Sequence, residues 1–295
     1  MVVLLGLTAA VLYGSGDFLG GMATRRAHVL TVLTLVETAA VIVAVAVALL
    51  SGGPASLPGL AWGFGAGAIG GLGLIIFYVG LAAGPMSVVA PVSGLVATVL
   101  PVAVALAEGE RPGAGVYAGA LLCLVAIVLA SAAPQASESD VPSKTGKTGK
   151  TGRAHPRRRL SRAIAYGTAS GVAFGQFFLL IRNAGRSGEV WPVAAGRIGE
   201  LAVVLAAAAV LRPGLRGVRG GIPLAAVSAG VIDVVANLCY VAATRIGAFG
   251  LAVVLASLYP GVTVLLARLV LGERLRWIQR VGLGLAAVGI LLVTV

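Results

Sequence analysis

Ten stretches of almost unbroken apolar residues divide this sequence, and they limit what it can fold into more than any other feature. A helix needs roughly 20 apolar residues to cross the hydrocarbon core of a bilayer. Only helices satisfy the backbone polar groups of such runs in lipid. The runs cover residues 2–21, 29–50, 59–81, 86–106, 114–132, 163–181, 190–211, 222–243, 248–270 and 278–295. We therefore predict an all-α membrane protein with ten transmembrane helices.

Composition also favours a bilayer over water as the solvent. Hydrophobic residues make up 59% of the chain and charged residues only 11%, whereas a soluble domain carries about 25% charge. The net charge of +12 could indicate a nucleic-acid partner. However, the charges cluster in short loops and no nucleic-acid-reading module accompanies them. We expect a lipid bilayer around the chain and no nucleic acid.

A polar segment, residues 134–162, interrupts the apolar runs at the middle of the chain. It holds eight of the 22 Lys and Arg residues and almost no large apolar side chains. Such a segment cannot bury a core, so it predicts a basic, flexible linker. The linker separates a first unit, residues 1–133, from a second, residues 163–295.

The basic residues of the connecting loops predict an orientation. Numbered from the first run, the odd loops hold 16 Lys and Arg residues and the even loops hold four. Basic loops stay in the cytoplasm. The pattern therefore places the linker in the cytoplasm and both termini outside a cell membrane.

The two units repeat each other in sequence. A shift of 163 residues superposes two Gly-Glu-Arg motifs, residues 109–111 and 272–274, and places Glu37 on Glu200. Tyr78 falls on Tyr240 with a shift of 162, and Asp17 on Gln176 with a shift of 159. Five spans in each unit turn the second upside down relative to the first. This is the inverted-repeat plan of secondary transporters, whose substrate site lies near the midplane. Chance similarity among Ala-, Gly-, Val- and Leu-rich helices is the alternative.

The segment Tyr259–Leu275, with its Tyr-Pro-Gly start and Gly-Glu-Arg-Leu end, resembles the EamA family of the drug/metabolite transporter superfamily. The resemblance extends over essentially the whole chain, although the first half has Ala97 where the second has Pro260. It implies a ten-helix secondary transporter of small metabolites, often an exporter. It also implies that the third, fourth, sixth and ninth helices form cavity walls. It further implies that both termini lie in the cytoplasm, whereas the charge pattern predicts that they lie outside.

Polar and charged side chains inside the runs are the candidate substrate-binding or proton-coupling residues, because each charge costs about 2.5–3.5 kcal/mol in lipid. They are Asp17, Glu37, Arg197, Glu200, Asp233 and Asn237. Asp233 has no cation nearby in the sequence, so we expect it to carry a proton. Arg197 and Glu200 share a helix face and could form an ion pair. Interhelical hydrogen bonds that specify packing are the alternative for each residue.

Other residues could line the same cavity or could serve packing. The possible lining residues are Tyr13, Tyr78, Gln176, Tyr240 and Tyr259. A tyrosine near a helix end can equally anchor the helix at the interface. Small residues at four-residue spacing, residues 63, 67 and 71 and residues 6, 10 and 14, predict close helix packing.

The sequence thus predicts a secondary active transporter of a small polar or amphipathic metabolite, working by alternating access, with a proton as a candidate coupling ion. We expect no catalytic residues, metal or cofactor, since His28 and His155 both lie outside the runs. The alternative is a non-transporting or flippase-type membrane subunit that acts on a lipid-linked carrier.

Overall fold

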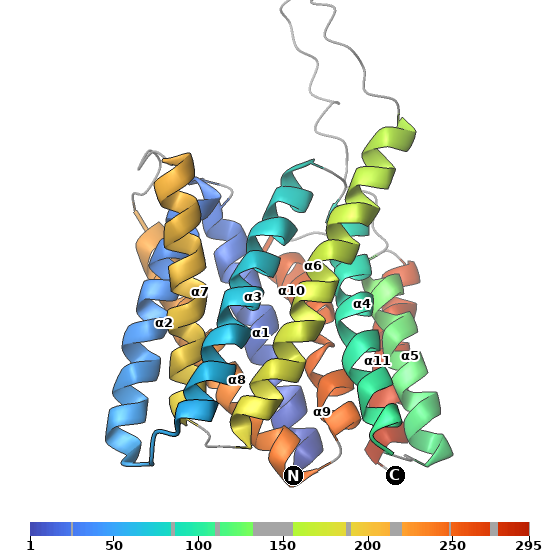
Figure 1. The fold of residues 1–295 in the computed structure, drawn as a ribbon. Helices are drawn as coiled ribbons and strands as arrows, with labels where there is room; N and C mark the ends of the chain where they lie inside the picture. Colours follow the sequence, from blue (N-terminus) through green and yellow to red (C-terminus); the bar gives the residue numbers. More distant parts are fainter. Residues whose placement is uncertain are drawn as a thin grey trace, which may run out of the picture.

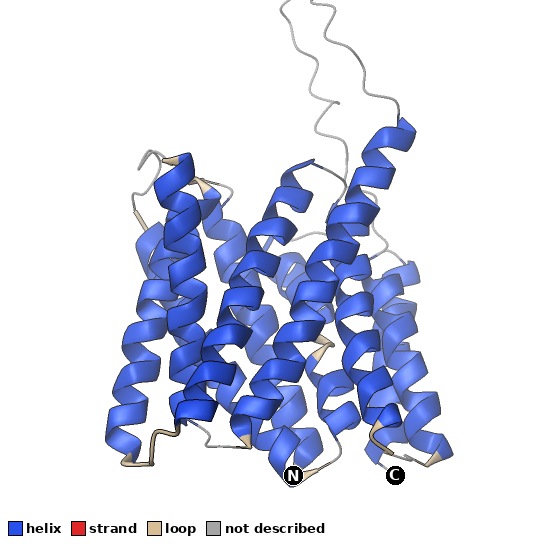
Figure 2. Ribbon diagram, in the orientation of Figure 1, coloured by secondary structure: helices blue, strands red, loops and turns tan. Residues whose placement is uncertain are grey.

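The computed structural model describes residues 1–24, 26–83, 86–109, 113–131, 156–186, 190–212, 220–247, 249–271 and 277–294. Within these ranges every regular element is an α-helix (Figure 2). The helices are α1 (Val2–Thr24), α2 (Val29–Ser51), α3 (Leu57–Ala83), α4 (Met86–Ala107), α5 (Ala114–Ser131), α6 (Pro156–Gly185), α7 (Val190–Leu211), α8 (Ile222–Ile246), α9 (Phe249–Ala256), α10 (Tyr259–Leu271) and α11 (Trp277–Thr294).

The observed helices follow the predicted runs, but α6 begins earlier than expected. It starts at Pro156 rather than at residue 163, so residues 156–162 belong to a helix and not to the linker. Proline is well suited to a first helical position because its missing N–H would be unpaired there in any case. The rest of the linker lies outside the described residues, as do residues 110–111 and 272–274 of the repeated motifs.

The ninth predicted run is also different, because it forms two helices instead of one. Helix α9 ends at Ala256 and α10 begins at Tyr259, with Ser257 and Leu258 in a turn between them. Pro260 has no N–H to donate to the carbonyl of Ala256. The chain therefore breaks before the proline and restarts with Pro260 in the first turn of α10.

Six of the helices are long and apolar enough to cross a membrane, counting only the described residues. They are α1, α2, α3, α7 and α8, together with α6 from Ser161 onward. Each is at least 22 residues long and has a high mean hydropathy. The chain is thus an all-α, multi-pass membrane protein.

The first half of the bundle, α1–α5, packs mainly against the second half, α6–α11, rather than within itself. Helix α1 lies along α8, α9 and α10, while α6 lies along α3 and α4. The pairs α2 with α7 and α5 with α11 also join the halves. Both termini lie at one end of the bundle, and α6 starts at the opposite end (Figure 1).

Candidate functional site

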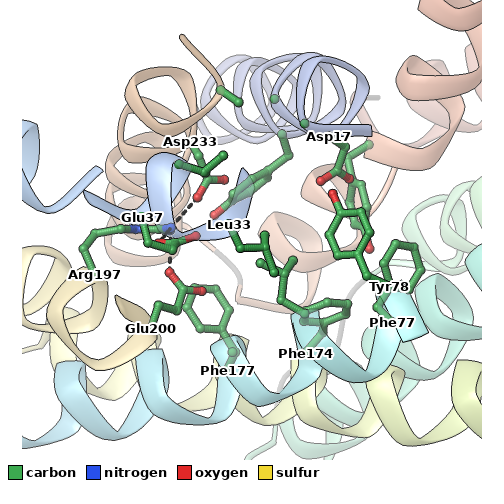
Figure 3. A pocket seen from close by; sticks show the side chains of 18 of the residues that line it. Asp17, Leu33, Glu37, Phe77, Tyr78, Phe174, Phe177, Arg197, Glu200 and Asp233 are labelled. Carbon is green, nitrogen blue, oxygen red and sulfur yellow. Dashed lines mark hydrogen bonds and ion pairs between the residues drawn. The ribbon is translucent and has the colours of Figure 1, made fainter. Parts of the chain in front are cut away.

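A cavity lies in the middle of the bundle, between the two halves. Helices α1, α2 and α3 line it from the first half and α6, α7, α8 and α10 from the second (Figure 3). It offers about 110 Å³ to water-sized molecules. One buried water needs roughly 10–15 Å³ of such space, so the cavity can hold several waters or a small solute. The resemblance implied walls from the third, fourth, sixth and ninth predicted helices. Of these, the third and sixth contribute as α3 and α6, and the ninth contributes through Tyr259 at the start of α10.

Arg197 on α7 is the centre of an ion-pair cluster at one end of the cavity. Its Nη1 atom lies 2.6 Å from Glu200 Oε2 and 3.5 Å from Glu37 Oε2. The same atom pairs with Asp233 Oδ2. Arg197 and Glu37 are almost completely buried. Three carboxylates from α2, α7 and α8 therefore share one guanidinium, and the cluster joins both halves.

Asp233 has no cation nearby in the sequence, but the fold brings Arg197 against it. The two residues lie on different helices, so their spacing in the sequence does not reveal the contact. Asp233 is also more exposed than its neighbours: its side chain keeps 26% of its accessible surface, against 4% for Arg197. It is the member of the cluster that is most open to the cavity.

Glycines on α3 position the cluster by letting α7 come close. A Cβ atom on Gly67 would lie 1.7 Å from the carbonyl oxygen of Gly196, and one on Gly63 would lie 2.2 Å from that of Pro192. A Cβ on Gly70 would lie 2.9 Å from Glu200 Oε1. The predicted packing role of the α3 glycines is confirmed. It fixes the segment of α7 that carries Arg197 and Glu200.

Asp17 on α1 occupies the other end of the cavity, away from Arg197 (Figure 3). Tyr78 of α3 lies beside it: a Cβ on Gly20, one turn after Asp17, would lie 3.5 Å from the Tyr78 hydroxyl oxygen. Tyr259, at the start of α10, is also close enough to Asp17 for an electrostatic interaction. This end therefore combines one carboxylate with phenol groups from both halves.

Aromatic rings form much of the remaining cavity wall. The Tyr13 and Tyr259 ring centroids lie 6.3 Å apart, and those of Phe77 and Phe174 lie 5.9 Å apart. Phe177 also lines the cavity. Sequence reasoning missed the phenylalanines. Their signal is the spacing of Phe174, Phe177 and Phe178 on one face of α6.

Three of the proposed site residues lie elsewhere. Asn237 is buried, and its amide donates to the backbone oxygen of Asp233 at 2.9 Å. The Tyr240 hydroxyl donates to the backbone oxygen of Phe178 at 3.3 Å inside the core. Gln176 is exposed on the outer face of α6. The repeat alignment equated it with Asp17, but α6 turns its phenylalanines inward instead.

A second ion pair joins the halves at the end of the bundle that holds the termini. Arg182 Nη1 near the end of α6 lies 2.7 Å from Oε2 of Glu108, just after α4. The Arg182 guanidinium also lies 4.0 Å from the centroid of the Phe249 ring on α9. A buried cluster, here called the basal core, fills the space between this pair and the cavity. Its members larger than alanine are Phe177, Phe178, Ile181, Val193, Tyr240, Val241, Phe249 and Val253.

Metal binding has no support in the part of the chain that the structure describes. There, His, Cys, Asp and Glu side chains do not gather in groups of three that could hold an ion. The carboxylates of the cluster surround the guanidinium of Arg197 instead.

Comparisons with known proteins agree with this architecture. The model of the EamA-like transporter family matches residues 161–295. No curated protein matches the sequence at a significant level. Seventeen chains of solved structures match the fold. One is a crystal structure described only as that of a protein; it is 21% identical, covers 99% of this chain and 95% of its own, and has a TM-score of 0.76. That likeness shows the fold alone. The family match runs from α6 through α11, so the second half of the chain is similar to the EamA-like transporter family.

Proposed function

We propose that this protein is a secondary active transporter that exports a small polar or amphipathic metabolite by alternating access. In this proposal ten spans form two inverted five-helix repeats that rock about the central cavity. The positions of the chain ends support it, since both termini lie at one end of the bundle and α6 starts at the other. Glu37 and Glu200, which the sequence repeat equates, also both reach Arg197.

The observation that carries the proposal is a charged cavity whose side chains come from both halves. Charges inside a membrane protein are costly unless they meet partners or water. Here they surround a space large enough for a small solute, at the interface that must open and close in a rocking movement. The basal core and the Arg182–Glu108 pair close the end that holds the termini. In the proposed cycle, this conformation is the one that is closed at the end that holds the termini.

The charge balance of the cluster supports proton coupling. One guanidinium can neutralise one of its three carboxylates, and two surplus negative charges in a buried site are unfavourable without protons or a bound cation. Asp233 is the most exposed of the three acids to the cavity. We propose that it takes up a proton on one side of the membrane and releases it on the other.

Asp233→Asn tests this role in vesicles that contain the purified protein and an imposed pH gradient. A screen of candidate metabolites first identifies a solute that the wild-type protein moves. The variant should then lose gradient-driven uptake while keeping its elution profile and thermal stability. Val235→Thr, on the outer face of the same helix, should transport normally. Undiminished uptake by Asp233→Asn would refute the coupling role.

The charge pattern of the loops further leads us to propose a cytoplasmic linker and external termini. A single cysteine at Ser143, within the linker, reports this orientation. It should react with a membrane-impermeant maleimide only after cells are opened. Labelling from outside intact cells would overturn the orientation.

A further inference from the structure

The cavity carries more acid than base, and this imbalance indicates what it binds. Among the described residues that line it, Asp17, Glu37, Glu200 and Asp233 are acidic and Arg197 is the one basic residue. The three acids other than Asp17 each form an ion pair with Arg197. The guanidinium therefore has no positive charge left to attract an anionic group of a solute.

Asp17 has a different environment from the other acids. It forms no ion pair with any residue that the structure describes. It lines the cavity at the end away from Arg197, and the Tyr78 hydroxyl lies near it (Figure 3). A carboxylate in such a position is stabilised by a cation that enters the cavity.

Aromatic rings surround this end of the cavity and supply a second, independent signal. Phe77 packs edge to face against both Tyr78 and Phe174, with centroids 5.8 and 5.9 Å apart. Tyr13 and Tyr259 meet in the same manner. Ring faces attract organic cations within about 6 Å, most strongly where water is excluded. The walls thus suit a cation with an apolar body better than a hydrated metal ion.

An unpaired hydroxyl gives a third indication of a ligand. The Tyr13 side-chain oxygen is buried, and it has no hydrogen-bond partner among the described groups. Tyr13 lines the cavity and lies one helical turn before Asp17 on α1. Leaving a buried hydroxyl unpaired costs about 1–3 kcal/mol, which an N–H donor on a bound solute would offset.

Resting on the transport function proposed above, we propose that the substrate is a small aromatic or apolar amine without a carboxylate. Its ammonium group binds Asp17 and contacts the neighbouring phenol groups, and its apolar body lies against Phe77 and Phe174. A free amino acid fits poorly, since its carboxylate would meet three acids around a guanidinium that is already neutralised. The cavity therefore selects for an amine over the amino acid of the same side chain.

Three probes that share a phenyl group test this selectivity by equilibrium dialysis with the purified full-length protein in detergent. They are 2-phenylethylamine, a cation; phenylalanine, a zwitterion; and 3-phenylpropanoate, an anion. We expect saturable binding of the amine, at least tenfold weaker binding of phenylalanine and no binding of the anion. Absence of amine binding, or equal or tighter binding of either other probe, would overturn the proposal.

Variants assign the binding to Asp17. Asp17→Asn should weaken amine binding at least tenfold, whereas Asp17→Glu should keep it within about threefold. Ser15→Ala removes a hydroxyl that bonds only to the backbone of its own helix, and it should leave binding unchanged. If Asp17→Asn runs as a monodisperse peak and binds the amine like the wild type, Asp17 is not the site. If Asp17→Asn does not fold, amine binding by Asp17→Glu is the test. Complete loss of amine binding by Asp17→Glu would contradict the proposal, and retained binding would support it.

Flux through vesicles separates this proposal from the transport function itself. Amine binding in dialysis without flux of any solute would leave the cation site standing and refute transport. Uptake of anionic or zwitterionic solutes, with no uptake of the amine, would leave transport standing and refute the cation site.

Discussion

At the scale of single residues, the arrangement around Arg197 shows how a membrane protein keeps charge in its interior. The guanidinium holds acids from three helices, so it serves both packing and the cavity. An unpaired charge buried at this position would be strongly unfavourable, because it would lose its hydration without gaining a partner. Removing the guanidinium itself should therefore change the stability of the fold as well as the properties of the site.

Arg197→Gln should destabilise the protein strongly, because it leaves three carboxylates without their cation. Breaking a buried ion pair by removing one partner costs roughly 3–5 kcal/mol. Thermal unfolding in detergent measures the loss. Arg182→Gln is the matched control, since its partner Glu108 is 44% exposed and such pairs contribute about 1 kcal/mol or less. Equal shifts for the two variants would contradict the central place of Arg197.

At the scale of elements, the contact between α3 and α7 sets the geometry of the site. The α3 glycines lie against the backbone of α7, so the two helices approach more closely than larger residues would allow. Gly67 meets Gly196 one residue before Arg197. The position of the guanidinium thus depends in part on Gly67 and Gly196, which do not line the cavity.

Gly67→Ala should disrupt this contact, whereas Gly65→Ala on the same helix should not. The added methyl group at Gly67 would overlap the Gly196 carbonyl oxygen, and overpacking of this kind costs about 1–3 kcal/mol or more. A methyl group at Gly65 meets no atom within 4 Å. Thermal unfolding of both variants tests this, and similar midpoints would show that the helices can separate at little cost.

Sequence patterns predicted the helices well because each apolar run has only one way to satisfy its backbone in lipid. They also singled out charged residues that line the cavity, since charges are rare in such runs: Asp17, Glu37, Arg197, Glu200 and Asp233. Partners on other helices were not predictable, so the Asp233 contact was missed. A repeat alignment also fixes position along a helix better than rotation about it, which is why Gln176 was assigned to the wrong face.

At the scale of the whole molecule, the halves are interleaved rather than set side by side. Helix α1 lies among α8, α9 and α10, and α6 lies against α3 and α4. A movement of one half against the other must therefore change the cavity and both ends of the bundle together. The basal core and the Arg182–Glu108 pair would have to separate when the end that holds the termini opens.

Cross-linking that end tests alternating access most directly. Cysteines replace Glu108 and Arg182 in a variant whose Cys123 and Cys239 are serine, and a short bifunctional thiol reagent joins them. We expect vesicle uptake of the solute found in the screen to fall at least tenfold after cross-linking and to return after reduction. The same reagent should not affect a variant with serine at residues 108 and 182. Uptake by the cross-linked protein at the rate of the reduced protein would contradict the account.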